Sequence, residues 1–264
     1  MPMFRFVALL LVLPAAAVNA DPNAAARREF QSAYAAVATT APGTAVADSD
    51  ALRNYPLYLY LQAARLQRRI SDPAAAADIA AFLAANGDQP VARSLRRSWL
   101  MELALRKQWD AYLAAYREDL DDTMAARCNA LAARIALGRT TGLDESATAM
   151  YLNPGSLPPA CDPVIDWLRG ESLLTSSLVE KRARLALGAG EAALARFLAR
   201  SLPDAQAAPI NQWAALIEQP RTAVDALIAA PTRAVETLAL LDGWSRAARA
   251  DTEATAARFP ALVQ

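Results

Sequence analysis

The sequence predicts an all-α protein, a superhelix (α-solenoid) of stacked antiparallel helix hairpins of a degenerate tetratricopeptide-like kind. Apolar residues recur at helical spacing in one segment after another, and no stretch shows the sustained alternation that marks a strand. Short loops join the helical segments, which favours stacked hairpins over one compact bundle. Adjacent small residues such as Ala132 and Ala133 allow neighbouring helices to approach closely. No strict repeat period is present, so the repeats are degenerate.

Capping residues mark the helix ends in the first part of the chain. The helix that holds the tyrosines of "RNYPLYLYLQ" has Asp50 or a neighbour as its cap, and Pro56 fits its first turn. In the next helix Asp72 is the cap and Pro73 the first helical residue, while Gly87 follows the end. Three residue types in their preferred positions make this second prediction the more specific one.

Further helices follow from periodicity. In helix 89–108 four apolar side chains share one face, which predicts that this face is buried: Val91, Leu95, Trp99 and Leu103. We expect the longest helix to begin at Pro231. The remaining helical segments are 22–38, 109–119, 122–138, 161–169, 177–188, 190–201, 209–217, 221–229, 231–247 and 250–258.

The first twenty residues have the pattern of a secretory signal. A single charge at Arg5 precedes the apolar run 6–17, and small residues stand at the cleavage position near Ala20. The run is too short for a stable membrane span, although a retained N-terminal anchor is an alternative. We therefore expect residues 1–20 to be a cleaved signal peptide and residues 21–264 to form the mature region, outside the cytosol and without a membrane span.

The two cysteines, Cys128 and Cys161, gain significance from this compartment. In a secreted chain a single disulfide between them is the natural expectation. Two unpaired buried thiols are the alternative.

Composition excludes several function classes. The chain contains no histidine, which removes histidine-based nucleophile systems, histidine general bases and the usual zinc sites. Its 27 basic and 27 acidic side chains balance, so nothing favours nucleic acid as a partner. No phosphate-binding loop or metal-ligand cluster is present. We expect no cofactor and no metal.

No residue stands out as catalytic. Sugar-cleaving enzymes need a carboxylic acid in an apolar cleft. The pairs Glu145-Ser146 and Glu171-Ser172 lie at the boundaries of expected helices, where such residues cap and meet solvent. The five tryptophans are scattered about one per helix, which is more typical of core residues than of a sugar-binding row.

Three motifs, in order, resemble the N-terminal superhelical U-domain of soluble lytic murein transglycosylases. They are a Leu…Tyr-Pro-Leu…Tyr-Leu segment, a Cys-Asn helix and an Ala-Cys-Asp helix. The likeness extends from Asp21 to about Pro203. The matching residues are Tyr55, Pro56, Leu57, Tyr60, Leu61, Cys128, Asn129, Ala160, Cys161 and Asp162.

The resemblance implies a joined cysteine pair and a role in peptidoglycan metabolism. The family cleaves the MurNAc-GlcNAc bond without hydrolysis, using a glutamate in a C-terminal lysozyme-like domain. The sequence stops at Gln264 before any such segment, so we expect no catalytic activity from this chain alone. The implied role is that of a periplasmic module whose partners are peptidoglycan glycan strands or a catalytic transglycosylase. A periplasmic scaffold that binds protein partners is the alternative.

The tyrosines of the first motif admit two interpretations. They are packing material between helices or a platform for sugar rings. Leu57 and Leu61 lie four residues apart, as do Leu59 and Ala63, and Tyr60 extends the same apolar surface. Since nearly every side of this helix is apolar, packing is favoured, with Tyr58 the best candidate for an exposed exception.

Overall fold

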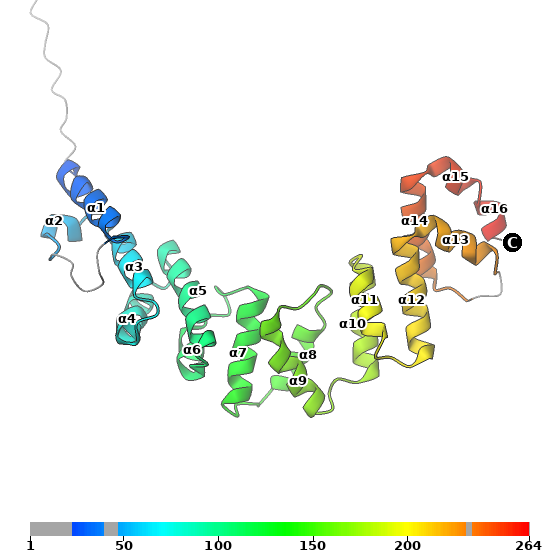
Figure 1. Ribbon diagram of the computed structural model, residues 1–264, viewed down its shortest axis with the longest axis horizontal. Coiled ribbons are helices and arrows are strands. Elements are labelled where there is room, and N and C mark those ends of the chain that lie inside the picture. Colours follow the sequence, from blue (N-terminus) through cyan, green and yellow to red (C-terminus); the bar gives the residue numbers. More distant parts are fainter. Residues whose placement is uncertain (1–22, 40–46, 231–233, 264) are drawn as a thin grey trace, which may run out of the picture. The chain divides into compact units, whose positions relative to one another are not determined.

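The computed structural model describes residues 23–39, 47–230 and 234–263, and these residues form helices with no strand among them (Figure 1). The prediction of an all-α fold of stacked helices is thereby confirmed. The expected signal sequence, residues 1–20, lies outside the described residues. Within those described, every helix is too short or too polar to span a bilayer.

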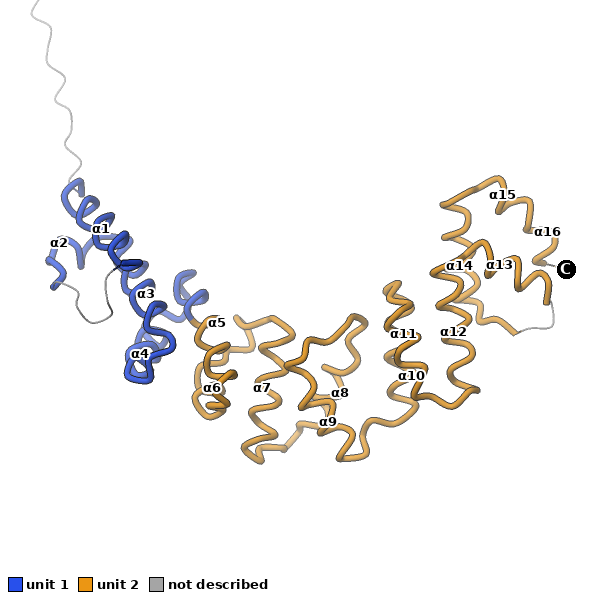
Figure 2. Tube along the Cα trace, in the orientation of Figure 1, with its two compact units in different colours: residues 1–95 blue, residues 96–264 orange. Residues whose placement is uncertain are grey.

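The chain divides into two compact units, residues 1–95 and 96–264 (Figure 2). Helix α5 contributes its first turns to unit 1 and the rest to unit 2. The elements of unit 1 are α1 (Ala24–Ala36), α2 (Asp50–Arg53), α3 (Tyr58–Arg68), the 3₁₀ turn η1 (Pro73–Ala75), α4 (Ala76–Asn86) and the start of α5 (Pro90–Leu105).

Unit 2 continues the same pattern of short helices and tight loops. Its elements after α5 are α6 (Trp109–Ala115), α7 (Met124–Ala136), α8 (Leu143–Tyr151), η2 (Pro159–Cys161), α9 (Asp162–Gly170), α10 (Ser176–Gly188), α11 (Ala192–Ala199), α12 (Asp204–Glu218), α13 (Pro220–Ile228), α14 (Thr237–Ala250), α15 (Thr252–Ala256) and α16 (Phe259–Leu262).

Neighbouring helices of unit 2 pack through small side chains. Helices α10 and α11 are joined by only three residues and lie side by side as an antiparallel hairpin, against which α12 packs (Figure 1). Ala183 and Ala186 of α10, Ala195 of α11 and Ala214 of α12 are fully buried. Because alanine adds little bulk, these backbones approach closely, and one continuous apolar core runs from Cys128 to Ala239.

The capping prediction for the helix that begins at Asp72 and Pro73 is correct. The Asp72 carboxylate accepts a hydrogen bond from the backbone N–H of Ala74 at 2.9 Å, and Pro73 opens the turn that leads into α4. Gly87 follows the last helical residue, as expected. The long face of α5 is also buried as predicted at Leu95, Trp99 and Leu103, while Val91 is half-buried.

The tyrosine helix begins later than the sequence suggested. Asp50 opens a separate short helix, α2, which Ser49 caps by accepting from the N–H of Leu52. Pro56 lies in the turn between α2 and α3, two residues before α3 begins, rather than in the first turn of α3. A proline has no N–H to donate to a preceding carbonyl, so α2 does not continue into α3.

Two helices in unit 2 differ in their starts. Helix α12 begins at Asp204, not at Pro209, because the carbonyl of Pro203 accepts from the N–H groups of Gln206 and Ala207, each at 2.9 Å. Pro209 therefore lies inside the helix. Helix α14 begins at Thr237 instead of 231, and residues 231–233 lie outside the described part.

Helix length and number also needed correction. Among the described helices, α5 is the longest with 16 residues, whereas α14 has 14. Helix α8 was not predicted at all. It contains Glu145 and Ser146, which had suggested a helix boundary, and Gly142 precedes it in the left-handed conformation with a φ of 64°.

Candidate functional site

The residues of the first motif do two different things. Tyr55 is half-buried, and its ring centroid lies 5.3 Å from that of Phe30 in α1. Leu61 is fully buried, whereas Pro56 and Leu57 are exposed in the turn. Tyr55 and Leu61 thus act as packing between helices, as expected.

Tyr58 is fixed by a polar cluster rather than exposed. Its hydroxyl donates to the Asp48 carboxylate at 2.8 Å, and Arg65 donates two hydrogen bonds to the same carboxylate at 2.6 and 2.8 Å. These bonds, that from Arg65 above all, hold the pKa of Asp48 below its usual value. Burial, followed by the hydrogen bond to Asp48, raises the pKa of Tyr58. The prediction that Tyr58 is the exposed tyrosine is therefore wrong.

The exposed tyrosine is Tyr60, which is 43% exposed. It lines a groove of about 540 Å³ in unit 1, together with Tyr34 of α1, which is 47% exposed. We call this the tyrosine groove. Its lining residues are Tyr34, Val37, Ala38, Tyr60, Ala63, Ala64, Gln67, Arg68, Pro90, Val91, Ser94 and Leu95.

Three helices build the tyrosine groove, each with one face. Helix α3 contributes Tyr60 and the residues three, four, seven and eight positions further on, which is the spacing of a single helical stripe. The first turns of α5 and the end of α1 form the other walls. The packing interpretation therefore fails for Tyr60, because its side chain is 43% exposed in this groove.

The other two motifs meet at a disulfide. Cys128 in α7 and Cys161 in η2 are joined, with their Cα atoms 4.8 Å apart and both residues fully buried. Asn129 is half-buried in α7, one position after Cys128. Asp162 is exposed at the first position of α9. A negative charge at this end of a helix interacts favourably with the helix dipole. The two cysteines of these motifs thus link α7 to η2.

The two Glu-Ser pairs do not form a catalytic cleft. Glu145 and Ser146 are exposed in the first turns of α8, and the Ser146 hydroxyl donates to the carbonyl of Gly142 at 3.3 Å. Glu171 follows α9, and its side chain is exposed in a small depression of about 220 Å³. The depression also includes Asp144 and the half-buried Trp167. Neither glutamate is shielded from water, as a catalytic acid in an apolar cleft would be.

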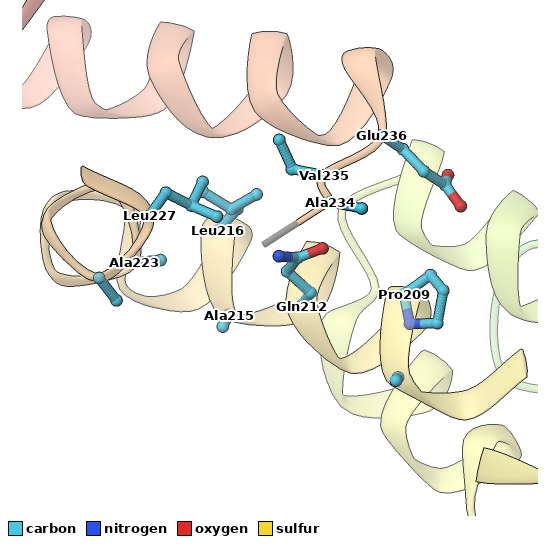
Figure 3. Close-up of a pocket in the computed structure, with 11 residues that line it drawn as sticks. Pro209, Gln212, Ala215, Leu216, Ala223, Leu227, Ala234, Val235 and Glu236 are labelled. Carbon is cyan, nitrogen blue, oxygen red and sulfur yellow. The ribbon is translucent and has the colours of Figure 1, made fainter. Parts of the chain in front are cut away.

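A second groove, of about 580 Å³, lies in unit 2 (Figure 3). It is formed by α12, α13 and residues 234–236, and its lining is mostly apolar, with Leu216, Leu227 and Val235 among the larger side chains. Among the described residues of its lining, Glu236 is the only charged one. Arg184 donates to both oxygens of that carboxylate, at 2.5 and 2.8 Å, and lowers its pKa. We call this the apolar groove.

The described residues contain no cluster of three or more acidic, cysteine or histidine side chains that could hold a metal ion. The two grooves differ in character: the described lining of the tyrosine groove includes two exposed tyrosines and one arginine, whereas that of the apolar groove is largely apolar.

The fold defines the chain as a stack of α-helical hairpins, and comparison with known proteins identifies its relatives. No protein-family model matches the chain. It is 29% identical over 215 residues to the soluble lytic murein transglycosylase of Salmonella typhimurium, covering 81% of this chain and 33% of that protein. It is also 29% identical over 217 residues to the Escherichia coli K12 protein of the same name, again covering 81% of this chain and 33% of that protein.

Solved structures agree with this similarity. A 70-kDa soluble lytic transglycosylase in complex with bulgecin A matches with a TM-score of 0.69 and 27% identity, covering 92% of this chain and 39% of that one. An inactive mutant of the lytic transglycosylase Slt from Pseudomonas aeruginosa matches with a TM-score of 0.70 and 27% identity, covering 88% and 37%. The chain is homologous to soluble lytic murein transglycosylases and spans about a third of the length of these curated relatives.

Proposed function

We propose that this chain is a periplasmic, peptidoglycan-associated helical module of the lytic murein transglycosylase type, which contacts glycan strands without cleaving them. The observation that carries the proposal is the homology over 81% of the chain to proteins that are named for their action on murein. The tyrosine groove supplies a surface of the right chemistry, because exposed aromatic rings beside polar groups suit sugar rings.

The glutamates of the two Glu-Ser pairs are not shielded, which argues against either of them as a catalytic acid. Glu145 and Glu171 both face solvent, so neither offers the protected acid that glycosidic cleavage needs. We therefore expect a gel containing peptidoglycan to show no cleared zone at the position of this chain. A cleared zone that persists in the double variant Glu145→Gln, Glu171→Gln would reveal an acid elsewhere.

Co-sedimentation with isolated sacculi tests the proposal directly. The purified chain should pellet with intact sacculi at low salt and stay in solution once the sacculi have been digested to soluble fragments. The heat-unfolded chain provides the control for non-specific adhesion. Recovery of the folded chain in the supernatant at low salt would overturn glycan binding.

The apolar groove favours a second function, that of a scaffold for a protein partner, such as a catalytic transglycosylase. Its lining offers apolar side chains, and its one carboxylate is already engaged by Arg184. If a partner inserts here, Ala226→Arg should abolish its capture, because this exposed residue lines the groove. Ala193→Arg, exposed on α11 and outside the groove, is the matched control. Capture of a purified transglycosylase that is equally strong with both variants would exclude the apolar groove as the docking site.

A further inference from the structure

We propose that the tyrosine groove recognises the carboxylate-bearing sugar of a glycan strand, with Tyr34 and Tyr60 against the sugar faces and Arg68 on the carboxylate. This inference rests on the proposed function and names the chemistry of the ligand at one site. The ligand class is a chain of N-acetylated amino sugars in which every second sugar carries an acid group, as N-acetylmuramic acid does.

The rings of Tyr34 and Tyr60 are exposed, and the Tyr34 ring packs against another aromatic ring. The Tyr34 ring stacks on Phe30 with centroids 5.5 Å apart and an interplanar angle of 30°. Phe30 in turn contacts Tyr55 of the first motif, at 5.3 Å. A ring that is already oriented loses little freedom when a sugar packs on it, so this arrangement favours binding. It also explains how a half-buried motif residue, Tyr55, contributes to an exposed surface.

Among the described residues that line the groove, one is charged, and no described acidic side chain pairs with it. Three arginines follow one another along α3 and just after it. Arg65 is paired with Asp48, and Arg69 donates to Asp72 and Asp78 at 3.1 to 3.2 Å. Arg68 has no acidic partner among the described residues, and it is the only charged residue that lines the groove.

The remaining polar groups agree with an acidic sugar. Gln67, which precedes Arg68 in the chain, also lines the groove and offers an amide, which suits N-acetyl and hydroxyl groups. The described residues of the lining include no carboxylate that would repel an anion. An apolar helix of a protein partner would provide no anion to pair with the Arg68 guanidinium. We therefore favour the acidic glycan over such a helix.

Isothermal titration of the full chain with two tetrasaccharides tests the inference. One is a peptide-free tetramer of alternating N-acetylglucosamine and N-acetylmuramic acid, and the other is chitotetraose, which has no carboxylate. The wild-type chain should prefer the acidic tetramer. Arg68→Gln should weaken binding of the acidic tetramer about three- to tenfold, as expected for loss of one charged hydrogen bond at an exposed site, and leave chitotetraose unchanged. Arg68→Lys should restore part of the preference.

Two further variants complete the design. The double variant Tyr34→Ala, Tyr60→Ala should weaken both tetrasaccharides about tenfold, because it removes the surface that both share. Arg28→Gln is the matched control, since Arg28 is exposed in the same unit and does not line the groove. It should bind like the wild-type chain. Circular dichroism and thermal melting of each variant verify that it is folded.

The outcomes separate this inference from the proposed function. If the wild-type chain pellets with sacculi but Arg68→Gln keeps the full preference for the acidic tetramer, the inference is wrong and the proposed function stands. If the double variant Tyr34→Ala, Tyr60→Ala binds both tetrasaccharides as tightly as the wild-type chain, the tyrosine groove is not the binding site. If the chain binds the acidic tetramer in the groove but ignores sacculi, the proposed function fails alone. Binding of neither saccharide, with capture of an apolar peptide helix that the tyrosine variant abolishes, would replace the glycan with a protein partner.

Discussion

The backbone of Gly243 in α14 packs directly on the side chain of Leu216 in α12. A Cβ placed on Gly243 would lie 2.6 Å from Leu216 Cδ2 and 2.8 Å from its Cβ, well inside van der Waals contact. Leu216 is fully buried, so its Cβ cannot move away cheaply. The close approach of these two helices in unit 2 therefore depends on a residue without a side chain.

Gly243→Ala should lower the free energy of unfolding by about 1–3 kcal/mol, the usual cost of overfilling a packed site. The control is Gly188→Ala, at the end of α10, where an added Cβ meets nothing within 4 Å. Urea titration followed by circular dichroism measures both. Equal stability of the two variants would mean that α12 and α14 separate easily.

Removing the Asp48 carboxylate should destabilise unit 1 in a pH-dependent manner. Because the pKa of Asp48 is lower in the folded state, its contribution is present above the unfolded pKa near 4 and disappears as the pH falls through the folded value. Asp48→Asn should melt at a lower temperature than wild type at pH 7, and the difference should shrink toward pH 3. Asp50→Asn, on an exposed side chain, should show little change at either pH. A constant difference across this range would contradict the assigned role.

Replacing Arg182 should loosen the loop between α8 and η2. Its buried guanidinium donates to the carbonyls of Asn153 and Gly155, each at 3.3 Å, and lies 4.6 Å from the centre of the Tyr151 ring. Arg182→Lys should cost about 1–3 kcal/mol, because an ammonium cannot reproduce the two hydrogen bonds of the guanidinium and a carbonyl of a half-buried residue loses its donor. Hydrogen exchange should speed up at residues 152–158. The exposed neighbour provides the control, Lys181→Ala, which should leave exchange in this loop unchanged.

Loss of the disulfide should weaken unit 2. For a sequence separation of 33, the chain-entropy relation gives about 3–4 kcal/mol. The double variant Cys128→Ala, Cys161→Ala should therefore unfold at lower urea than the oxidised chain, and reductant should shift only the wild type. An unchanged midpoint for the double variant would show that packing around Cys128 and Cys161 holds this region without the bond.

Local capping chemistry could be predicted from the sequence because its determinants are adjacent in the chain. Asp72 followed by Pro73 forms the expected helix start, since both act on the nearest backbone groups. The apolar stripe of α5 is likewise buried, because helical geometry alone brings Leu95, Trp99 and Leu103 to one side.

The predicted helix starts were wrong where contacts outside the local motif are involved. Pro209 is a plausible first helical residue by itself, but the carbonyl of Pro203 starts α12 one and a half turns earlier. At the start of α14, Glu236 has extended backbone and its carboxylate is bound by Arg184 of α10, which lies 52 residues earlier in the chain. No local pattern contains that contact.

The candidate site was missed for the same reason. The stripe from Tyr60 to Arg68 is visible in the sequence, but a stripe alone does not say whether another helix covers it. Tyr58 looked equally free until Asp48, ten residues earlier, proved to be its partner. The charge on Arg68 carries information only once Arg65 and Arg69 are known to be paired.

The disulfide has a consequence for how damage to unit 2 would appear. Cys128 and Cys161 enclose all of α8 and the exposed turn around Pro154. A protease that cuts the backbone anywhere between them leaves the two fragments covalently attached, and the buried core continues on both sides of the cut. Such a nicked chain would run as one band without reductant and as two with it. In an oxidising compartment the disulfide would thus keep the two fragments of a cleaved chain covalently linked as one molecule.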